Sequence, residues 1–348
     1  MKRYPEINRL IRIEEVIMRE STKKIMREIL WILIILVSLT LFAGCLLNPA
    51  TSSNSTPAFQ NQNKSQTTAL PADPIFTAIS DGGFHSIALK DDGTVTNIWC
   101  TNDREIICSI PKNLTGVKSI SVGDEYSLAL KQDGTIVFWG KPDARMQIPT
   151  LTNTSTVSDI IAISAGSGHA LALKKDGTVI AKGSNIVGAL DVPANLMNVT
   201  SISAGDAHSL ALKNDGTVTG WGAQRGQYVA FGQANVPANL TGVIAISAGL
   251  QHSLALKKDG TIVAWGGNEY GQIDVPLNLT DVIAISAGNR HSLALKKDGT
   301  VVAWGINNTG QCNVPANLTD VVAISAGKIN SFALKKDGTI VSWGEMKL

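Results

Sequence analysis

The sequence predicts an all-β protein, a seven-bladed β-propeller, on the basis of three observations. An Asp-Gly pair recurs seven times at spacings of 39 to 44 residues, a period that is typical of propeller blades. Within each repeat, large and small side chains alternate with a period of two, as they do along a β-strand. The first and last repeats are as apolar as the middle ones, whereas an open stack of sheets would need polar repeats at its ends.

One of the middle repeats illustrates the expected strands. In VIAIS, residues 282–286, the large side chains of Ile283 and Ile285 are expected on one face of a strand. HSLAL, residues 291–295, and TVVAWG, residues 300–305, predict the second and third strands, joined by an Asp-Gly turn in which glycine tolerates a positive φ. Because such a sheet carries small or apolar side chains on both faces, both faces are expected to be buried between neighbouring sheets.

A fourth segment of the repeat is the basis for predicting how the ring closes. In QCNVPANL, residues 311–318, the proline favours a short outer strand or a loop. The last repeat ends without such a segment, but the chain ahead of the first repeat, residues 66–80, resembles residues 311–325. We therefore expect this N-terminal strand to complete the last blade, with Ala69–Pro71 pairing with Ile340–Trp343, and so to close the ring.

The N-terminal stretch has the pattern of a signal or anchor helix. Basic residues between Lys23 and Arg27 precede an apolar run from Ile29 to Gly44. The Ala-Gly-Cys sequence at its end resembles a lipoprotein cleavage site, which makes Cys45 a candidate for lipid attachment, and the uncleaved run is long enough to span a bilayer. We expect an exported prokaryotic domain anchored to the outer face of the cytoplasmic membrane or to the cell surface.

These patterns divide the chain into three parts. Residues 1–44 are expected to form a cytoplasmic stub and export signal or membrane anchor, residues 45–65 a flexible polar linker, and residues 66–348 the propeller. The net charge is only +2, and the basic residues concentrate at the N-terminus, so the propeller lacks the basic stripe that nucleic-acid binding requires. We expect a monomer without cofactor or metal.

The motif G-x-x-H-S-L-A-L-K-x-D-G-T-V-x-A-W-G resembles the regulator of chromosome condensation repeat family, a family of seven-bladed propellers. The resemblance extends from about Ile75 to Gly344. The additional segment at residues 310–319 is similar to that of prokaryotic secreted members, such as the propeller-type β-lactamase inhibitory protein. The resemblance implies a propeller that binds another macromolecule through loops at one end of the ring.

We therefore expect a protein–protein or protein–glycan interaction module at the cell surface rather than an enzyme. One alternative is a propeller enzyme such as a polysaccharide lyase or hydrolase, which a pair of carboxylates at one mouth of the ring would favour. A second alternative, implied by the founding member of the family, is a guanine nucleotide exchange factor-like regulator of a small GTPase.

The five histidines occupy one position of the repeat. A shared metal site is one interpretation, but residues on different blades lie too far apart for one ion, whose ligands stand about 2 Å away. Tyr126 and Asn330 take this position in the other two repeats, so we expect a structural hydrogen bond to a neighbouring turn. The histidines are His85, His169, His208, His252 and His291.

Tryptophan occupies a second repeat position, where we expect it to pack between blades. In the third repeat Lys182 stands there instead, and its ammonium group has to reach water along the seam. The tryptophans are Trp99, Trp139, Trp221, Trp265, Trp304 and Trp343.

Two kinds of modification are also expected. Cys100 and Cys108 are a candidate disulfide in an exported protein, which leaves Cys312 unpaired. Sequons that recur at one repeat position indicate either N-glycosylation or shared turn chemistry. They are Asn113, Asn198, Asn239, Asn278 and Asn317.

The loops that break the repeat contain the candidate partner-binding residues. Aromatic and arginine side chains are the usual anchors of interfaces, and functional loops are held by a rigid scaffold. These residues are Arg225, Tyr228, Phe231, Glu269, Tyr270 and Arg290. The repeated Lys-Lys-Asp-Gly turns place a positive pair on one edge of the ring, which is either a solvated edge or a basic rim for an acidic polymer.

Overall fold

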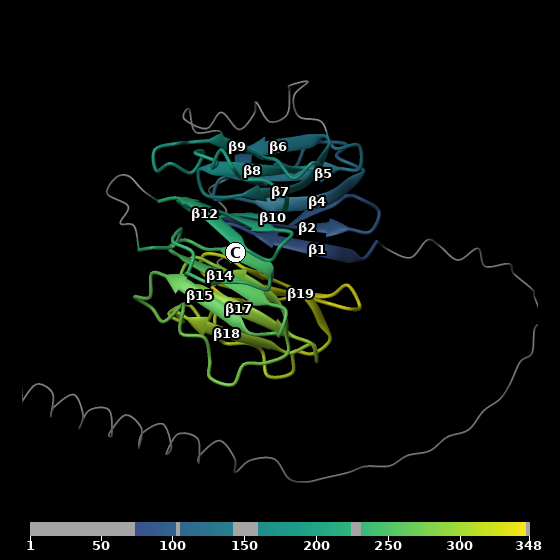
Figure 1. Ribbon diagram of the computed structural model, residues 1–348. Coiled ribbons are helices and arrows are strands. Elements are labelled where there is room, and N and C mark those ends of the chain that lie inside the picture. Colours follow the sequence, from purple (N-terminus) through teal and green to yellow (C-terminus); the bar gives the residue numbers. More distant parts are fainter. Residues whose placement is uncertain (1–73, 102–104, 142–158, 224–230, 346–348) are drawn as a thin grey trace, which may run out of the picture. The chain divides into compact units, whose positions relative to one another are not determined.

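The structure is a computed structural model that describes residues 74–101, 105–141, 159–223 and 231–345 of the chain. Residues Ala69–Leu348 form one compact unit. Its described part contains seven antiparallel sheets of three strands each, with the strands of every sheet in chain order (Figure 1). The fold is therefore all-β and consistent with a seven-bladed propeller, as the sequence predicts.

We number the blades 1 to 7 along the chain. Blades 1 and 2 contain β1 (Phe76–Asp81), β2 (His85–Lys90), β3 (Val95–Cys100), β4 (Val117–Val122), β5 (Tyr126–Lys131) and β6 (Ile136–Gly140). Blades 3 and 4 contain β7 (Ile160–Ala165), β8 (His169–Lys174), β9 (Val179–Gly183), β10 (Val199–Ala204), β11 (His208–Lys213) and β12 (Val218–Gly222). Blades 5 to 7 contain β13 (Val243–Ala248), β14 (His252–Lys257), β15 (Ile262–Gly266), β16 (Val282–Ala287), β17 (His291–Lys296), β18 (Val301–Gly305), β19 (Val321–Ala326), β20 (Asn330–Lys335) and β21 (Ile340–Gly344). A short helix, α2 (Glu105–Cys108), follows β3.

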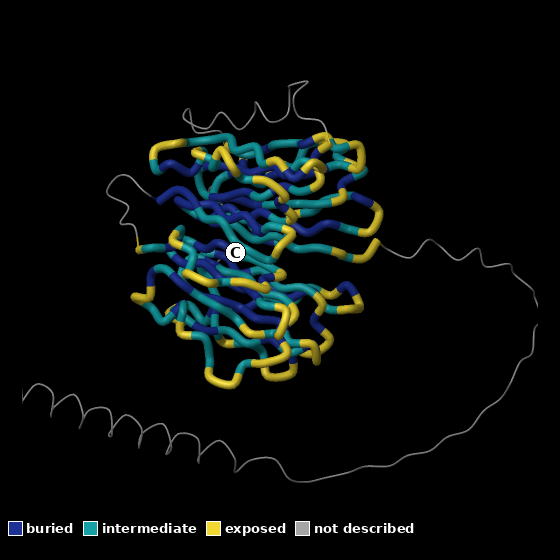
Figure 2. The backbone as a smooth tube through the Cα atoms, in the orientation of Figure 1, coloured by how far each residue is buried: buried dark blue, intermediate teal, exposed yellow. Residues whose placement is uncertain are grey.

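The middle strand of each blade is buried on both sides, and exposure increases towards the turns at the two ends (Figure 2).

The first strands carry a β-bulge, which changes one sequence-based expectation. In β16 the register shifts between Val282 and Ala284, so the side chain of Ile283 leaves the pleat and is 52% exposed. Ile283 therefore does not share a buried face with Ile285, as the alternation predicted. Ile285 packs in the core between blades.

The ring is closed by hydrogen bonds between the first strands of successive blades. The serine near the end of each first strand accepts a hydrogen bond from a backbone N–H of the next blade, at 2.8 to 3.1 Å. The same bond joins the two ends of the ring, where the N–H of Asp81 donates to Ser325 Oγ at 3.0 Å. Blade 7 thus contacts blade 1 as each blade contacts its neighbour.

The outer segment was assigned to the wrong blade by the sequence analysis. Trp343 Nε1 of β21 donates to the carbonyl of Gln311 at 2.8 Å, and Leu318 is buried in the same cluster as Trp343. Residues 311–318 therefore pack on blade 7, which they precede, and they form turns rather than a strand. The last blade already has its outer segment.

Tryptophan and its carbonyl partner are 32 residues apart in blades 4 to 7, so each of these blades carries the outer segment that precedes it. The predicted pairing of Ala69–Pro71 with β21 stays a prediction. Ala69–Pro71 lie outside the described residues, as do the apolar run, the linker and Cys45. In the described part of the chain, no helix is long and apolar enough to cross a membrane.

The buried histidines connect neighbouring blades across the seams, by which we mean the contact surfaces between one blade and the next. Each buried imidazole forms a hydrogen bond through Nε2 with a serine hydroxyl of the next blade, at 2.6 to 3.0 Å. The partner is a strand serine rather than the turn that we expected. Burial lowers the pKa of these histidines to about 3 or 4, so the rings are neutral at physiological pH.

Tyr126 replaces histidine where the next blade lacks the serine. The next blade carries Ala170 at the serine position, and the longer Tyr126 hydroxyl donates past it to the carbonyl of His169 at 2.6 Å. The tryptophans are buried and lie between blades; Trp343, for example, packs with Leu293 and Leu295 of blade 6. Lys182, at the corresponding position of blade 3, is half-buried.

Candidate functional site

The ring has two different ends. At one end, each first strand turns into the second strand and each third strand leaves the blade; we call this end the pocket face. At the other end lie the Asp-Gly turns and the starts of the first strands; we call it the Asp-Gly face. The antiparallel pairing places these features together in every blade, since the first residue of a first strand pairs with the last residue of the second.

A cavity of about 80 Å³ opens on the ring axis at the pocket face and is lined by residues of all seven blades. Its shape depends on a glycine at the end of each first strand. A Cβ atom on Gly249, for instance, would overlap the carbonyl oxygen of Gly288 in the next blade. The absence of a side chain lets the turns approach one another, and the N–H of Leu250 donates to this carbonyl at 3.3 Å.

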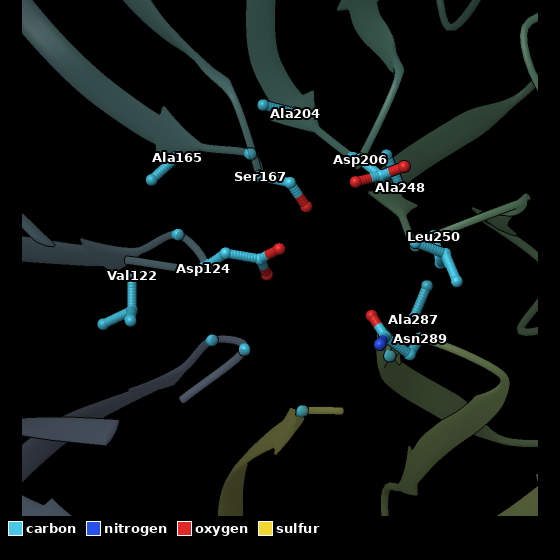
Figure 3. A pocket seen from close by; sticks show the side chains of 18 of the residues that line it. Val122, Asp124, Ala165, Ser167, Ala204, Asp206, Ala248, Leu250, Ala287 and Asn289 are labelled. Atoms are coloured by element: carbon cyan, nitrogen blue, oxygen red, sulfur yellow. The ribbon is translucent and has the colours of Figure 1, made fainter. Parts of the chain in front are cut away.

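The residue after this glycine directs its side chain towards the axis. In Figure 3, polar side chains from several blades converge on the centre of the ring. The residues at this position that line the cavity are Gly83, Asp124, Ser167, Asp206, Leu250 and Asn289. The pocket face therefore presents acidic, polar and apolar groups on different blades, although the scaffold repeats.

Asp81, Asp124 and Asp206 line the cavity with carboxyl groups, and the last two influence each other. Burial raises the pKa of Asp124, and the charge of Asp206 raises it further. Burial also raises the pKa of Asp206, while a hydrogen bond from Ser167 and the charge of Lys328 lower it. Two carboxylates that repel each other favour a cation or a positively charged side chain between them. Among the described residues, no group of three or more His, Cys, Asp or Glu could hold a metal ion.

A second group of side chains lies farther from the axis on blades 5 and 6. The guanidinium of Arg290, in the turn after β16, stacks on the ring of Tyr270 at 4.6 Å from its centroid. Glu269 beside it is exposed, and Phe231 is 38% exposed and lies next to Gly267. Four of the six predicted partner-binding residues are thus brought to the pocket face; Arg225 and Tyr228 lie outside the described residues.

The residues at the axis were not predicted from the sequence. Asp124, Ser167 and Asp206 occupy the first variable position of G-x-x-H, where adjacent repeats differ in charge and polarity. That variation within an otherwise constant turn was the available signal. It could be interpreted only once the turns were known to face a common axis.

The other predicted residues occupy structural or exposed positions. Cys100 and Cys108 form a disulfide, as expected. Cys312 is free, and burial raises the pKa of its thiol to about 11, which disfavours the reactive thiolate. The sequon asparagines are exposed, but Asn198 directly precedes a first strand and does not share the repeat position of Asn239 and Asn278.

A family model of the Regulator of chromosome condensation (RCC1) repeat matches residues 160–188, 199–227, 243–272 and 282–311, which fall in blades 3 to 6 and the segments after them. No curated protein matches this chain.

Three solved structures illustrate the similarity of fold. Prp20p from Saccharomyces cerevisiae has a TM-score of 0.62 at 19% identity, over 78% of this chain and 83% of that one. The ectodomain of the receptor kinase CR4 from Physcomitrella patens has a TM-score of 0.61 at 19% identity, over 78% and 74%. The ectodomain of the receptor kinase ACR4 from Arabidopsis thaliana has a TM-score of 0.58 at 19% identity, over 78% and 98%. At this identity the similarity establishes the fold alone.

Proposed function

We propose that this chain, whose blades 3 to 6 match the RCC1 repeat, is a membrane-tethered, extracytoplasmic interaction module whose pocket face binds a protein partner. The principal support is the difference between the scaffold and the pocket face. The blades repeat almost identical strands, yet the turns and loops at this face carry unlike charged, aromatic and polar groups. Function tends to lie on such loops when a rigid scaffold positions them.

The chemistry of the pocket face defines the partner. Tyr270 and Arg290 offer a preorganised, partly desolvated anchor of the kind that carries binding energy at interfaces. Asp124 and Asp206, at the axis, favour a lysine or arginine side chain of the partner. The module therefore binds a protein surface with a protruding basic residue next to an apolar or acidic contact.

The similar structures are compatible with such a role. The structure of Prp20p is described together with its binding to Gsp1p and histones, and a second structure shows yeast RCC1 bound to Kap60. The tether rests on the sequence, in which basic residues precede the apolar run from Ile29 to Gly44. The fold occurs in the ectodomains of two plant receptor kinases, so an extracytoplasmic position is compatible with it.

Partner capture tests this proposal. The full-length protein, extracted in detergent from cross-linked cells, is used to capture its partner, and the captured protein is identified and quantified for each variant. We expect Tyr270→Ala and Asp206→Asn each to reduce capture about tenfold, the effect of losing roughly 1.4 kcal/mol. Ile186→Ala changes an exposed residue in the loop after β9 at the same face and serves as the matched control. Equal capture by all variants would discard this site.

A hydrolase is the second candidate, because one observation favours it. Asp124 and Asp206 form a pair of carboxyl groups at one mouth of the ring, the feature that a glycosidase requires. However, burial raises the pKa of both, whereas a general acid and a nucleophile need environments that move their pKa values apart. The cavity of about 80 Å³ is also far below the roughly 300 Å³ or more of typical ligand sites.

An assay for glycan cleavage distinguishes the two candidates. A binding module leaves a panel of polysaccharides intact, and Asp124→Asn changes only capture of the partner. Release of reducing ends by the wild-type protein that Asp124→Asn abolishes would establish the hydrolase instead. The exchange-factor alternative shares the support that the similarity to Prp20p, which is described with its binding to Gsp1p, gives to a protein-binding propeller.

A further inference from the structure

Exposed apolar side chains are distributed unequally between the two faces of the ring. Of the ten large apolar side chains that are exposed among the described residues, seven lie at the Asp-Gly face. Ile75, directly ahead of β1, is one of them. The other six, which we call the apolar rim, are Ile161, Met197, Ile244, Leu277, Ile283 and Val322.

Three side chains of the apolar rim are exposed because they lie at the β-bulge of a first strand. Ile244, Ile283 and Val322 hold the same bulged position in blades 5, 6 and 7 and are 53%, 52% and 52% exposed. Because their strands are the first strands of three adjacent blades, these side chains lie on one side of the ring, at the end opposite to the cavity. Leu277 is 94% exposed and stands where the corresponding segments of blades 5 and 7 carry alanine. A solvated turn gives no reason for this larger side chain.

Unpaired lysines alternate with the apolar rim. In each Lys-Lys-Asp-Gly turn the first lysine pairs with the aspartate, as Lys296 Nζ does with Asp298 Oδ2 at 3.1 Å. The second lysines, Lys175, Lys258, Lys297 and Lys336, are exposed and make no ion pair within the described part of the chain. Asp281 and Asp320 are exposed at the same face, so its charges are mixed with a basic excess in these turns.

The first described residues of the chain lie at the Asp-Gly face. Ile75 lies against the turn of blade 7, where its Cβ is 2.9 Å from the position of a Cβ on Gly338, and its N–H donates to Asp91. In the sequence, 29 residues lie between Gly44, the end of the apolar run, and Pro74. That length of chain is enough for the propeller to reach a bilayer that holds the apolar run.

From these features we propose that the Asp-Gly face docks on an anionic lipid surface. The apolar rim enters the interfacial region of the bilayer, and Lys258, Lys297 and Lys336 contact lipid phosphates. This inference rests on the proposed tether, which places a bilayer within reach of this face. Docking in this orientation points the cavity and the Tyr270–Arg290 pair away from the membrane, where a partner has access to them.

The test uses the full-length protein with vesicles of phosphatidylcholine containing about one third phosphatidylglycerol. Flotation first measures whether the protein is bound to the vesicles. A water-soluble acylating reagent then labels lysines, and mass spectrometry quantifies each site in vesicles and in neutral detergent. We expect labelling of Lys258, Lys297 and Lys336 to fall roughly fivefold in the vesicles. Lys141 and Lys328, which lie at the pocket face, serve as internal controls and keep their labelling.

Variants separate docking from tethering. Ile244→Ser combined with Ile283→Ser and Val322→Ser changes exposed side chains only, so the fold is kept, and we expect flotation to persist while protection of the lysines is lost. Ile186→Ser, at an exposed site of the pocket face, is the matched control and retains protection.

Flotation of the wild type without protection overturns docking and leaves the tether intact. Absence of flotation overturns the tether, and docking with it. Equal protection in detergent assigns the face to a second copy of the chain or to another protein and also overturns lipid docking.

Discussion

The seam that closes the ring differs in chemistry from the five seams that histidine bridges. In those five, a neutral imidazole meets a serine hydroxyl of the next blade, whereas Asn330 takes the histidine position between blades 7 and 1. Asp81 is the last residue of the first strand in blade 1, whereas the first strands of the other blades end in alanine or valine. Asp81 accepts a hydrogen bond from Ser86. All seven seams keep the bond between serine and the backbone. The backbone thus closes the ring, and the side chains adjust to it.

The two kinds of seam respond to pH in opposite directions. Burial lowers the pKa of the seam histidines, so their seams weaken as the pH falls. Burial raises the pKa of Asp81, so the closing seam weakens as the pH rises above the ordinary value of an aspartate. Asp81 Oδ2 and both side-chain polar atoms of Asn330 are buried without a hydrogen-bond partner in the described structure. The closing seam is therefore the less well satisfied one at neutral pH.

Acid has the largest expected effect, because it acts on five seams together. A histidine in the unfolded chain has a pKa of about 6.5, whereas burial lowers the pKa of the seam histidines to about 4 or 3. As the pH falls through this range, the unfolded chain binds protons that the folded protein does not, and the free energy of unfolding decreases. Each buried histidine then removes stability on the order of 3 kcal/mol by the end of this range. Urea unfolding at pH 7, 6 and 5 measures the slope. A free energy of unfolding that is constant over this range would contradict neutral, buried histidines.

Truncation of the seam tryptophans has the next largest effect. Trp265→Ala in blade 5 and Trp343→Ala in blade 7 each remove a buried side chain and are expected to destabilise the fold by about 3 to 5 kcal/mol. Because the ring is closed, the last blade is expected to be as sensitive as a middle one. Urea unfolding followed by tryptophan fluorescence and circular dichroism compares the two variants. A much smaller loss at Trp343, with blade 7 unfolding separately, would show that the ring opens there.

Converting the closing seam into an ordinary one has a smaller and opposite effect. Asp81→Ala combined with Asn330→His removes the buried carboxylate and lets the new imidazole reach Ser86, as His291 reaches Ser331. We expect this double variant to be about 1 to 3 kcal/mol more stable at pH 7. The gain shrinks towards pH 5, where Asp81 of the wild type becomes easier to protonate and the new histidine becomes charged.

A double-mutant cycle checks whether the two positions act together. Asp81→Ala alone leaves Asn330 unsatisfied, and Asn330→His alone places an imidazole against a serine that Asp81 already engages. Each single variant is therefore expected to gain less than the pair, with a coupling of about 1 kcal/mol or more. Additive effects would mean that the two positions do not share the seam.

The smallest effect is expected at the surface of the closing seam. Lys328 Nζ of blade 7 lies over the ring of Phe84 in blade 1 at 4.2 Å. Lys328→Ala removes this cation–π contact across the seam and is expected to cost about 1 kcal/mol. Arg290→Ala is the control, because its stack on Tyr270 stays within blade 6. A larger loss of stability in the control would show that contacts within a blade matter more than those between blades 7 and 1.

The periodic part of this protein could be predicted from the sequence, and the contacts between repeats could not. Strand positions, turns and the number of blades follow from the repeated alternation and the Asp-Gly pairs. The exposure of Ile283 could not be derived, because a bulge changes the face of a side chain without changing the sequence pattern. The outer segment was assigned to the wrong blade because a sequence does not show which neighbour a connecting segment packs against.

The candidate site shows the same limit. Tyr270 and Arg290 were found because they interrupt the repeat, but the sequence did not show that they stack on each other. Asp124 and Asp206 are 82 residues apart, and nothing local links them. They form one electrostatic site only because the ring brings the corresponding turns of blades 2 and 4 to a common axis.

The sequence by itself determined the strands of each blade, their number and the buried columns, because a period of two and a repeated turn are local properties of the chain. The tertiary structure decided which side chains meet at the axis, which seam is least satisfied and which face is apolar. These depend on distances between residues of different blades, and closure of the ring alone sets those distances.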